Sequence, residues 1–179
     1  MMHLLDDNDK IPIMKLGSLI KICKTLENKG VRYLIVGGMA VIAHGYTRMT
    51  MDLDLVISLQ EKNIKNALDV FSQMGYRPRV PVKLHDFADP VKRASWIREK
   101  NMTVFSLISD DIQLPPIDIF VSEPFDFDVE YSQAERYTMD DDTSVPVVSL
   151  STLIKMKKEA NREKDRLDIS CLSHFLSEE

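Results

Sequence analysis

The stretch that most constrains the fold is Tyr33–Ser58, which reads YLIVGGMAVIAHGYTRMTMDLDLVIS. Its first part, 34–36, is an apolar β-branched run that is typical of a buried strand. The glycine pair Gly37-Gly38 ends that run, and the apolar segment 39–43 then predicts a helix. Acids and apolar residues alternate over 52–57 with the period of a strand. Strands separated by a helix predict a mixed α/β domain.

The two acids of this stretch, Asp52 and Asp54, are predicted to share one face of the second strand, about 6.6 Å apart. The apolar residues between and after them take the opposite, buried face. Two carboxylates this close repel each other unless a cation lies between them. Mg²⁺ meets this need, because it binds carboxylate oxygens together with substrate phosphates. The glycine pair upstream lets an anion approach the backbone N–H groups of the turn. A phosphate-binding turn followed by a pair of metal-binding acids predicts metal-assisted phosphoryl chemistry.

This arrangement resembles a known signature. Gly37-Gly38 followed by Asp52-x-Asp54 resembles the motif of the polymerase-β-type nucleotidyltransferase superfamily, in which a third acid lies between apolar residues on a later strand. Ile117-Asp118-Ile119 matches that third element. The longer string GGMAVIAHGYTRMTMDLDL is similar to the small AbiEii-like nucleotidyltransferases of abortive-infection and type IV toxin–antitoxin systems. The resemblance covers residues 14 to 176. It implies a nucleotidyltransferase fold: a mixed central sheet flanked by helices, with further helices at the C-terminus.

The resemblance also implies an activity. A nucleoside monophosphate would pass from an NTP to an acceptor hydroxyl, and pyrophosphate would leave. Asp52, Asp54 and Asp118 match the catalytic and metal-binding acids, and the implied ion is Mg²⁺ or Mn²⁺. The acceptor stays open between RNA, a protein and a small molecule, and a cognate toxin or antitoxin is an implied partner. The alternative is a weakly active or inactive relative that serves as an antitoxin-like or regulatory binding module, but such a module would not need all three acids.

Residues around the glycine turn are predicted to contact phosphate. Many members of the superfamily have a serine in or after this turn, whereas Met39 follows Gly37-Gly38 here. The contact therefore falls to backbone N–H groups or to other residues. Arg48 and Thr50 either contact phosphate or pair with the acids that follow them. His44, at the end of the predicted helix, is expected to cap or pack there rather than act as a base or ligand.

Positive charge gathers near the C-terminus, where residues 155–166 contain six bases. In isolation such a run is typical of a solvated helix face. The string LIKMKKEANREKDRLDI, however, resembles the C-terminal pattern of the AbiEii-like group. On that resemblance Lys157, Arg162 and Lys164 are predicted to bind the triphosphate through charge-assisted contacts. The neighbouring acids, Asp165 and Asp168, are predicted to be salt-bridged support residues rather than metal ligands.

Length and composition predict one domain at 13–179, preceded by a loose tail at 1–12, because 179 residues suffice for one sizeable core. Two lone cysteines without metal-site spacing, and no apolar run of about 20 residues, predict a cytoplasmic protein without a membrane partner. The net charge of −5 argues against a nucleic-acid surface over the whole chain. Helices are expected at 14–28, 39–43, 61–74, 91–100, from 150 and at 164–176. Strands are expected at 31–36, 52–58, 102–108, 117–121 and 145–148.

Overall fold

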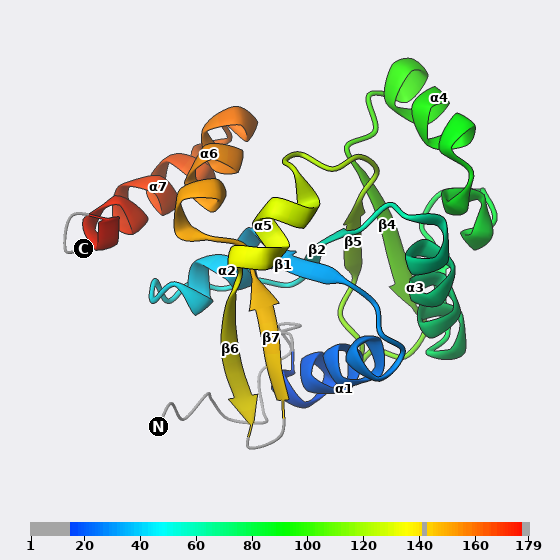
Figure 1. Cartoon of the computed structure of the whole chain (residues 1–179), viewed down its shortest axis with the longest axis horizontal. Helices are drawn as coiled ribbons and strands as arrows, with labels where there is room; N and C mark the ends of the chain where they lie inside the picture. Colours follow the sequence, from blue (N-terminus) through cyan, green and yellow to red (C-terminus); the bar gives the residue numbers. More distant parts are fainter. Residues whose placement is uncertain (1–14, 141–142, 177–179) are drawn as a thin grey trace.

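The computed structural model describes residues 15–140 and 143–176. The predicted tail, 1–12, lies outside these residues. In the described part of the chain, seven strands form one mixed sheet in the order β3-β4-β5-β2-β1-β7-β6 (Figure 1). The strands are β1 (Tyr33–Val36), β2 (Leu53–Ile57), β3 (Tyr76–Pro78), β4 (Val104–Ser109), β5 (Ile117–Phe120), β6 (Glu135–Asp140) and β7 (Thr143–Val147). The predicted mixed α/β fold is confirmed.

Helices cover the sheet and extend beyond it. They are α1 (Leu16–Asn28), α2 (Gly37–Ala43), α3 (Glu61–Gln73), α4 (Pro90–Lys100), α5 (Phe127–Gln133), α6 (Leu150–Ala160) and α7 (Glu163–Leu176), with a short 3₁₀ helix, η1 (Leu84–Ala88). Each of α1 and α3 buries one apolar face, as their sequence periodicity predicts. The two C-terminal helices, α6 and α7, lie side by side on the other side of the sheet from α1 (Figure 1). None of the described helices is long and apolar enough to cross a membrane.

The centre of the sheet joins the segments that the sequence marks as important. Strand β2 pairs antiparallel with β1 and parallel with β5. In this register Asp54 is opposite Val36, the residue before the glycine pair, and also opposite Asp118. Residues Leu53 and Leu55 of β2 are fully buried, so alternate positions fix which face carries the acids. The strand pairing therefore brings the three elements of the signature together.

The joint between α6 and α7 is short and well defined. The Ser149 hydroxyl accepts a hydrogen bond from the Thr152 N–H at 3.3 Å and caps the start of α6. The helix ends at Asn161, which adopts the left-handed conformation with φ of 48°. Asparagine tolerates this conformation better than most residues. The turn redirects the chain so that Arg162 and Lys164, at the start of α7, lie near Asp54.

Several predicted boundaries were wrong. Strand β2 begins at Leu53, so Asp52 directly precedes the strand instead of opening it. Segment 76–90, to which the sequence analysis assigned no helix or strand, contains the three-residue strand β3 and the 3₁₀ helix η1. Segment 125–137, which has no clear periodicity, contains α5 and the start of β6. Strand β6 is an edge strand whose residues are exposed or half-buried, so it lacks the apolar alternation that marks a strand in a sequence.

Candidate active site

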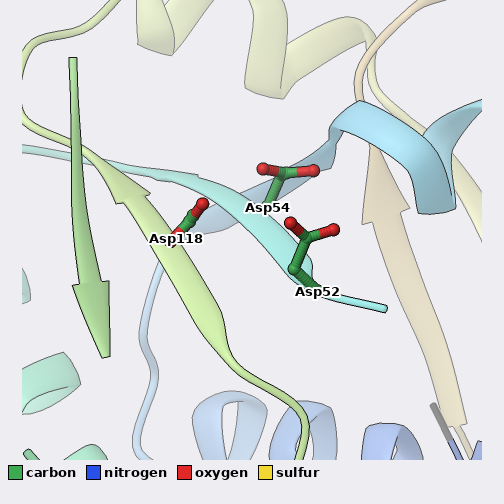
Figure 2. Close-up of side chains that lie close together, drawn as sticks. All are labelled: Asp52, Asp54 and Asp118. Carbon is green, nitrogen blue, oxygen red and sulfur yellow. The ribbon is translucent and has the colours of Figure 1, made fainter. Parts of the chain in front are cut away.

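Three carboxylates converge at the ends of the central strands. Oxygens of Asp52, Asp54 and Asp118 all lie within 4.8 Å of one another. Figure 2 shows the side chains projecting from the start of β2 and from β5 into the same space. All three residues are half-buried, so one side of the cluster stays open to a ligand.

The glycine turn touches this cluster directly. Gly37 has φ of 63°, a conformation that glycine adopts without strain. A Cβ at this position would overlap the Asp54 carboxylate oxygen Oδ2, so the space is open only to glycine. The Gly38 backbone N–H donates a hydrogen bond to the Asp54 carboxylate. The glycine turn and Asp54 therefore pack directly against each other.

The carboxylates repel one another. Burial, followed by the negative charges of Asp52 and Asp118, raises the pKa of the Asp54 carboxyl to about 6. The hydrogen bond from Gly38 and the charge of Lys164 oppose this rise. Near neutral pH the cluster therefore carries several negative charges in a confined, half-buried space. Such a donor set fits a hard divalent cation.

The raised pKa of Asp54 predicts a pH dependence of stability. Because the folded-state pKa of Asp54 lies above the unfolded value, the folded protein binds the proton more tightly. The stabilisation is complete below about pH 4 and is lost as the pH rises through about 6, so the free energy of unfolding should fall by about 2–3 kcal/mol over this range. Urea denaturation in EDTA, from pH 4 to 7, measures this fall. Asp54→Asn should flatten the curve and be the more stable protein at pH 7; parallel curves for the two proteins would contradict the prediction.

Thr50 and Arg48 lie beside the second glycine. A Cβ on Gly38 would overlap the Thr50 hydroxyl and would lie 3.1 Å from the Arg48 nitrogen Nη2. The Thr50 hydroxyl donates to the Asp52 carboxylate at 3.4 Å. Arg48 pairs with Asp168 instead, with 2.6 Å between Nη1 and Oδ2. Of the two roles left open by the sequence, pairing with the acids holds for Thr50, whereas the partner of Arg48 comes from α7.

Asp168 belongs to a buried network of charges. Its Oδ2 also accepts a hydrogen bond from Lys157 Nζ at 2.7 Å, and the same Nζ lies 3.3 Å from Asp165 Oδ1. Arg162 Nε donates to Asp165 Oδ2 at 2.7 Å. Burial alone would raise the pKa of Asp165, but the hydrogen bond and charge of Arg162 bring it below its usual value. The network connects α6 and α7 to Arg48 and so to the glycine turn.

The three predicted phosphate-binding cations therefore differ in burial and in ion pairing. Lys157 is buried and held by two carboxylates, whereas the Arg162 side chain is 60% exposed despite its bond to Asp165. Lys164 is exposed, and its charge acts on Asp54. His44 ends α2, where Nε2 lies 2.8 Å from the Val148 carbonyl oxygen. These positions leave Arg162 and Lys164 as the cations most able to reach a ligand, while His44 packs against the end of β7.

Removing the shared carboxylate should cost stability. In Asp168→Asn, Arg48 and Lys157 would lose the negative charge that both contact, so the free energy of unfolding should fall by about 2–4 kcal/mol. Urea denaturation measures the change. The control is Asp69→Asn, which removes an exposed acid on α3 and should change stability by less than about 0.5 kcal/mol. Equal stabilities for the two variants would contradict the structural role of Asp168.

A pocket of about 480 Å³ opens beside the triad. Asp54 and Asp118 lie on one wall, and Lys157 and Arg162 contribute from α6 and the turn after it. The remaining lining comes from residues that the sequence analysis did not select: Thr103, Val104, Phe120, Pro124, Leu153, Met156, Glu159 and Ala160, together with Gly37. The one available signal was the position of Phe120, two residues after Asp118 on the same strand.

Comparison with known proteins agrees with this geometry. The model of a protein family described as aminoglycoside-2''-adenylyltransferase matches residues 18–172. The chain belongs to this family. The predicted enzyme class, nucleotidyltransferase, is therefore confirmed, and the triad, the turn and the pocket lie within the matched region. No curated protein sequence matches the chain significantly.

Solved structures share the fold. A lincosamide antibiotic adenylyltransferase with lincomycin bound is 16% identical, with a TM-score of 0.58 over 88% of this chain and 95% of that chain. The antibiotic-resistance factor ANT(2'')-Ia is 15% identical, with a TM-score of 0.59 over 93% and 86%. A putative nucleotidyltransferase from Thermotoga maritima is 17% identical, with a TM-score of 0.54 over 92% and 93%. The finer assignment to the AbiEii-like group finds no support in these comparisons.

Proposed function

We propose that this protein transfers an adenylyl group from ATP to a hydroxyl group of a small-molecule antibiotic. The observation that carries the proposal is the cluster of Asp52, Asp54 and Asp118 packed against the glycine turn. The family description and two of the similar structures name antibiotic adenylyltransferases. Neither that description nor the three structure descriptions name an RNA or a protein as acceptor, and none of them refers to a toxin or an antitoxin.

The triad fits a divalent cation, Mg²⁺ or Mn²⁺. Three carboxylates with oxygens within 4.8 Å of one another offer the hard oxygen ligands that these ions prefer. When bound, such an ion supplies positive charge that stabilises the phosphates and the developing transition state. Asp52, Asp54 and Asp118 would hold it. The raised pKa of Asp54 is the expected property of such a cluster without a cation.

Each residue of the site has a distinct role in the proposed transfer. Gly37 leaves room for the Asp54 carboxylate to pack against the turn, and Arg162 and Lys164 neutralise the pyrophosphate as it leaves. The acceptor oxygen forms a bond to the α-phosphorus, the bond from that phosphorus to the bridging oxygen breaks, and a carboxylate of the triad, Asp118, takes the hydroxyl proton. Arg48 and Lys157 are held by Asp168 and position the turn and α6. Catalysis rests on positioning and charge neutralisation.

The proposal predicts how the melting temperature responds to ligands. Mg²⁺ at millimolar concentration should raise the melting temperature, because it binds the folded triad and relieves its repulsion. ATP should raise it further only when Mg²⁺ is present. Thermal melts with Mg²⁺, ATP, both or neither measure this pattern, and Asp54→Asn should remove it. A wild-type melting temperature that ignores both ligands would contradict the proposal and favour an inactive binding module.

Acceptor identity is tested with the substrates that the comparisons suggest. Purified protein is incubated with ATP, Mg²⁺ and either lincomycin or an aminoglycoside that has a free 2''-hydroxyl. Adenylylated product, detected by mass spectrometry, is expected with an antibiotic and not with a tRNA-sized RNA. An adenylyl group found on the RNA and on neither antibiotic would overturn the proposed acceptor class.

A further inference from the structure

The charge network of α6 and α7 contains one more base than acid. Arg48 and Lys157 both contact Asp168, at 2.6 and 2.7 Å. Lys157 and Arg162 both contact Asp165, at 3.3 and 2.7 Å. Two carboxylates therefore serve three cations, and the network as a whole is positively charged. Its most exposed member is Arg162, whereas both carboxylates are buried.

The triad has the opposite imbalance. Among the residues that the structure describes, no ion pair includes Asp52, Asp54 or Asp118. Their oxygens lie within 4.8 Å of one another instead. The site therefore combines a surplus of negative charge in the triad with a surplus of positive charge in the neighbouring helices.

Two of the helical cations act on the triad without contacting it. Arg162 lines the same pocket as Asp54 and Asp118. Its hydrogen bond to Asp165 and, after that, the charges of Asp54 and Asp52 raise the pKa of the Arg162 guanidinium. The charge of Lys164 opposes the rise in the pKa of Asp54 that burial causes. Both cations therefore compensate part of the charge of the triad from a distance.

Such compensation affects the two ligands of the site in opposite ways. A divalent cation that enters the free protein is repelled by Arg162 and Lys164, because like charges in one half-buried site repel each other. A triphosphate brings negative charge that attracts these bases as well as the metal. The same two residues therefore oppose the metal when it binds alone and favour the nucleotide.

We propose that Arg162 and Lys164 keep the metal affinity of the free protein low, so that the divalent cation binds tightly only together with the phosphates of the nucleotide. The inference rests on the proposed function and adds a control over its metal site. If these residues served the triphosphate alone, their removal would leave the metal affinity of the free protein unchanged. If their role were purely structural, their removal would weaken the binding of both ligands.

Metal binding to the free protein tests the first half of this proposal. Metal-free full-length protein is titrated with Mn²⁺ at about pH 8, where the carboxylates are ionised, and the electron paramagnetic resonance signal of the free ion gives the dissociation constant. Arg162→Gln and Lys164→Gln should each tighten Mn²⁺ binding about fivefold. Arg162→Lys keeps the charge and should stay within about twofold of the wild type. Lys158→Gln, which removes an exposed base of α6 outside the pocket lining, should do the same.

Nucleotide binding tests the second half. The same proteins are titrated with α,β-methylene ATP, which cannot release pyrophosphate, in the presence of Mg²⁺. Arg162→Gln and Lys164→Gln should each weaken this binding about fivefold or more. Thermal melts show which variants are folded. Lys164 is exposed and has no ion pair within the described residues, so Lys164→Gln decides the question if the loss of the Arg162–Asp165 contact destabilises the other variant.

Tighter binding of Mn²⁺ together with weaker binding of the nucleotide, in each folded variant, is the expected result. Unchanged or weaker Mn²⁺ binding in a folded variant would overturn the inference, and so would unchanged nucleotide binding. The fate of the proposed function is separate. Opposite changes in the two affinities, without adenylyl transfer to either antibiotic by the wild type, would support the inference and contradict the proposed function. Transfer by the wild type, with the same Mn²⁺ affinity in all variants, would do the reverse.

Discussion

Asp54→Asn is expected to reduce adenylyl transfer by about 10³-fold or more while leaving the protein folded. Asp54 lies at the centre of the site: it contacts the glycine turn, pairs with Asp118 across β2 and β5, and would hold the proposed cation together with both other acids. Asparagine keeps the shape of the side chain but removes the charge that would hold a cation. Initial rates at saturating ATP and Mg²⁺, compared with the wild type, measure the loss.

Asp69→Asn is the matched control for that experiment. It removes one exposed carboxylate from α3, away from the pocket, and should leave the rate unchanged. A rate for Asp54→Asn within about tenfold of the wild type, with full occupancy by ATP, would show that the triad is not the catalytic centre.

Gly37→Ala should disable the protein in two ways. The backbone at Gly37 has φ of 63°, which costs alanine about 1–2 kcal/mol, and the added Cβ would overlap Asp54 Oδ2. The Asp54 carboxylate must then move away from its partners. We expect the free energy of unfolding to fall by about 2–4 kcal/mol and transfer to fall by about 100-fold. Urea denaturation and the rate assay measure the two effects separately.

Gly17→Ala provides the comparison, because nothing lies within 4 Å of a Cβ at that position in α1. Alanine is a better helix former than glycine, so this variant should be as stable as the wild type or more stable by up to about 1 kcal/mol. If Gly37→Ala behaved like Gly17→Ala, the packing of the turn against Asp54 would have no energetic importance.

The sequence predicted most of the central sheet because its signals are local. Strand β2 alternates Asp54 with buried Leu53 and Leu55, and the glycine turn marks the end of β1. Strand β6 was missed because an edge strand with exposed residues has no apolar period. Segment β3 is three residues long, too short for any pattern to emerge.

The candidate site was predictable where it depends on a motif and not where it depends on distant contacts. Asp52 and Asp54 were selected from their spacing and Asp118 from the resemblance to the superfamily signature, and the structure brings the three together. The pairing of Arg48 with Asp168 joins residues 120 positions apart, which no local pattern indicates. Lys157 could be recognised as a conspicuous base, but its burial between two acids arises only when α6 and α7 pack.

The lining of the pocket beside the triad was the least predictable part. Its apolar wall combines Val104, Phe120 and Pro124 with Met156, and each of these residues alone is typical of ordinary core packing. Only the three-dimensional arrangement shows that they border Asp118 rather than close the core. Resemblance to a superfamily therefore indicated the reaction type, whereas the lining of the pocket is assembled from residues of separate elements.

The most direct test of the central claim follows the adenylyl group itself. Protein, Mg²⁺ and ATP labelled at the α-phosphate are incubated with lincomycin or with an aminoglycoside that has a free 2''-hydroxyl, and the product is analysed by mass spectrometry alongside released pyrophosphate. Label is predicted on a hydroxyl of the antibiotic, with one pyrophosphate released for each product and no product from Asp54→Asn. Label that remains in ATP, or hydrolysis to AMP without transfer to any acceptor supplied, would contradict the assignment of the triad to adenylyl transfer.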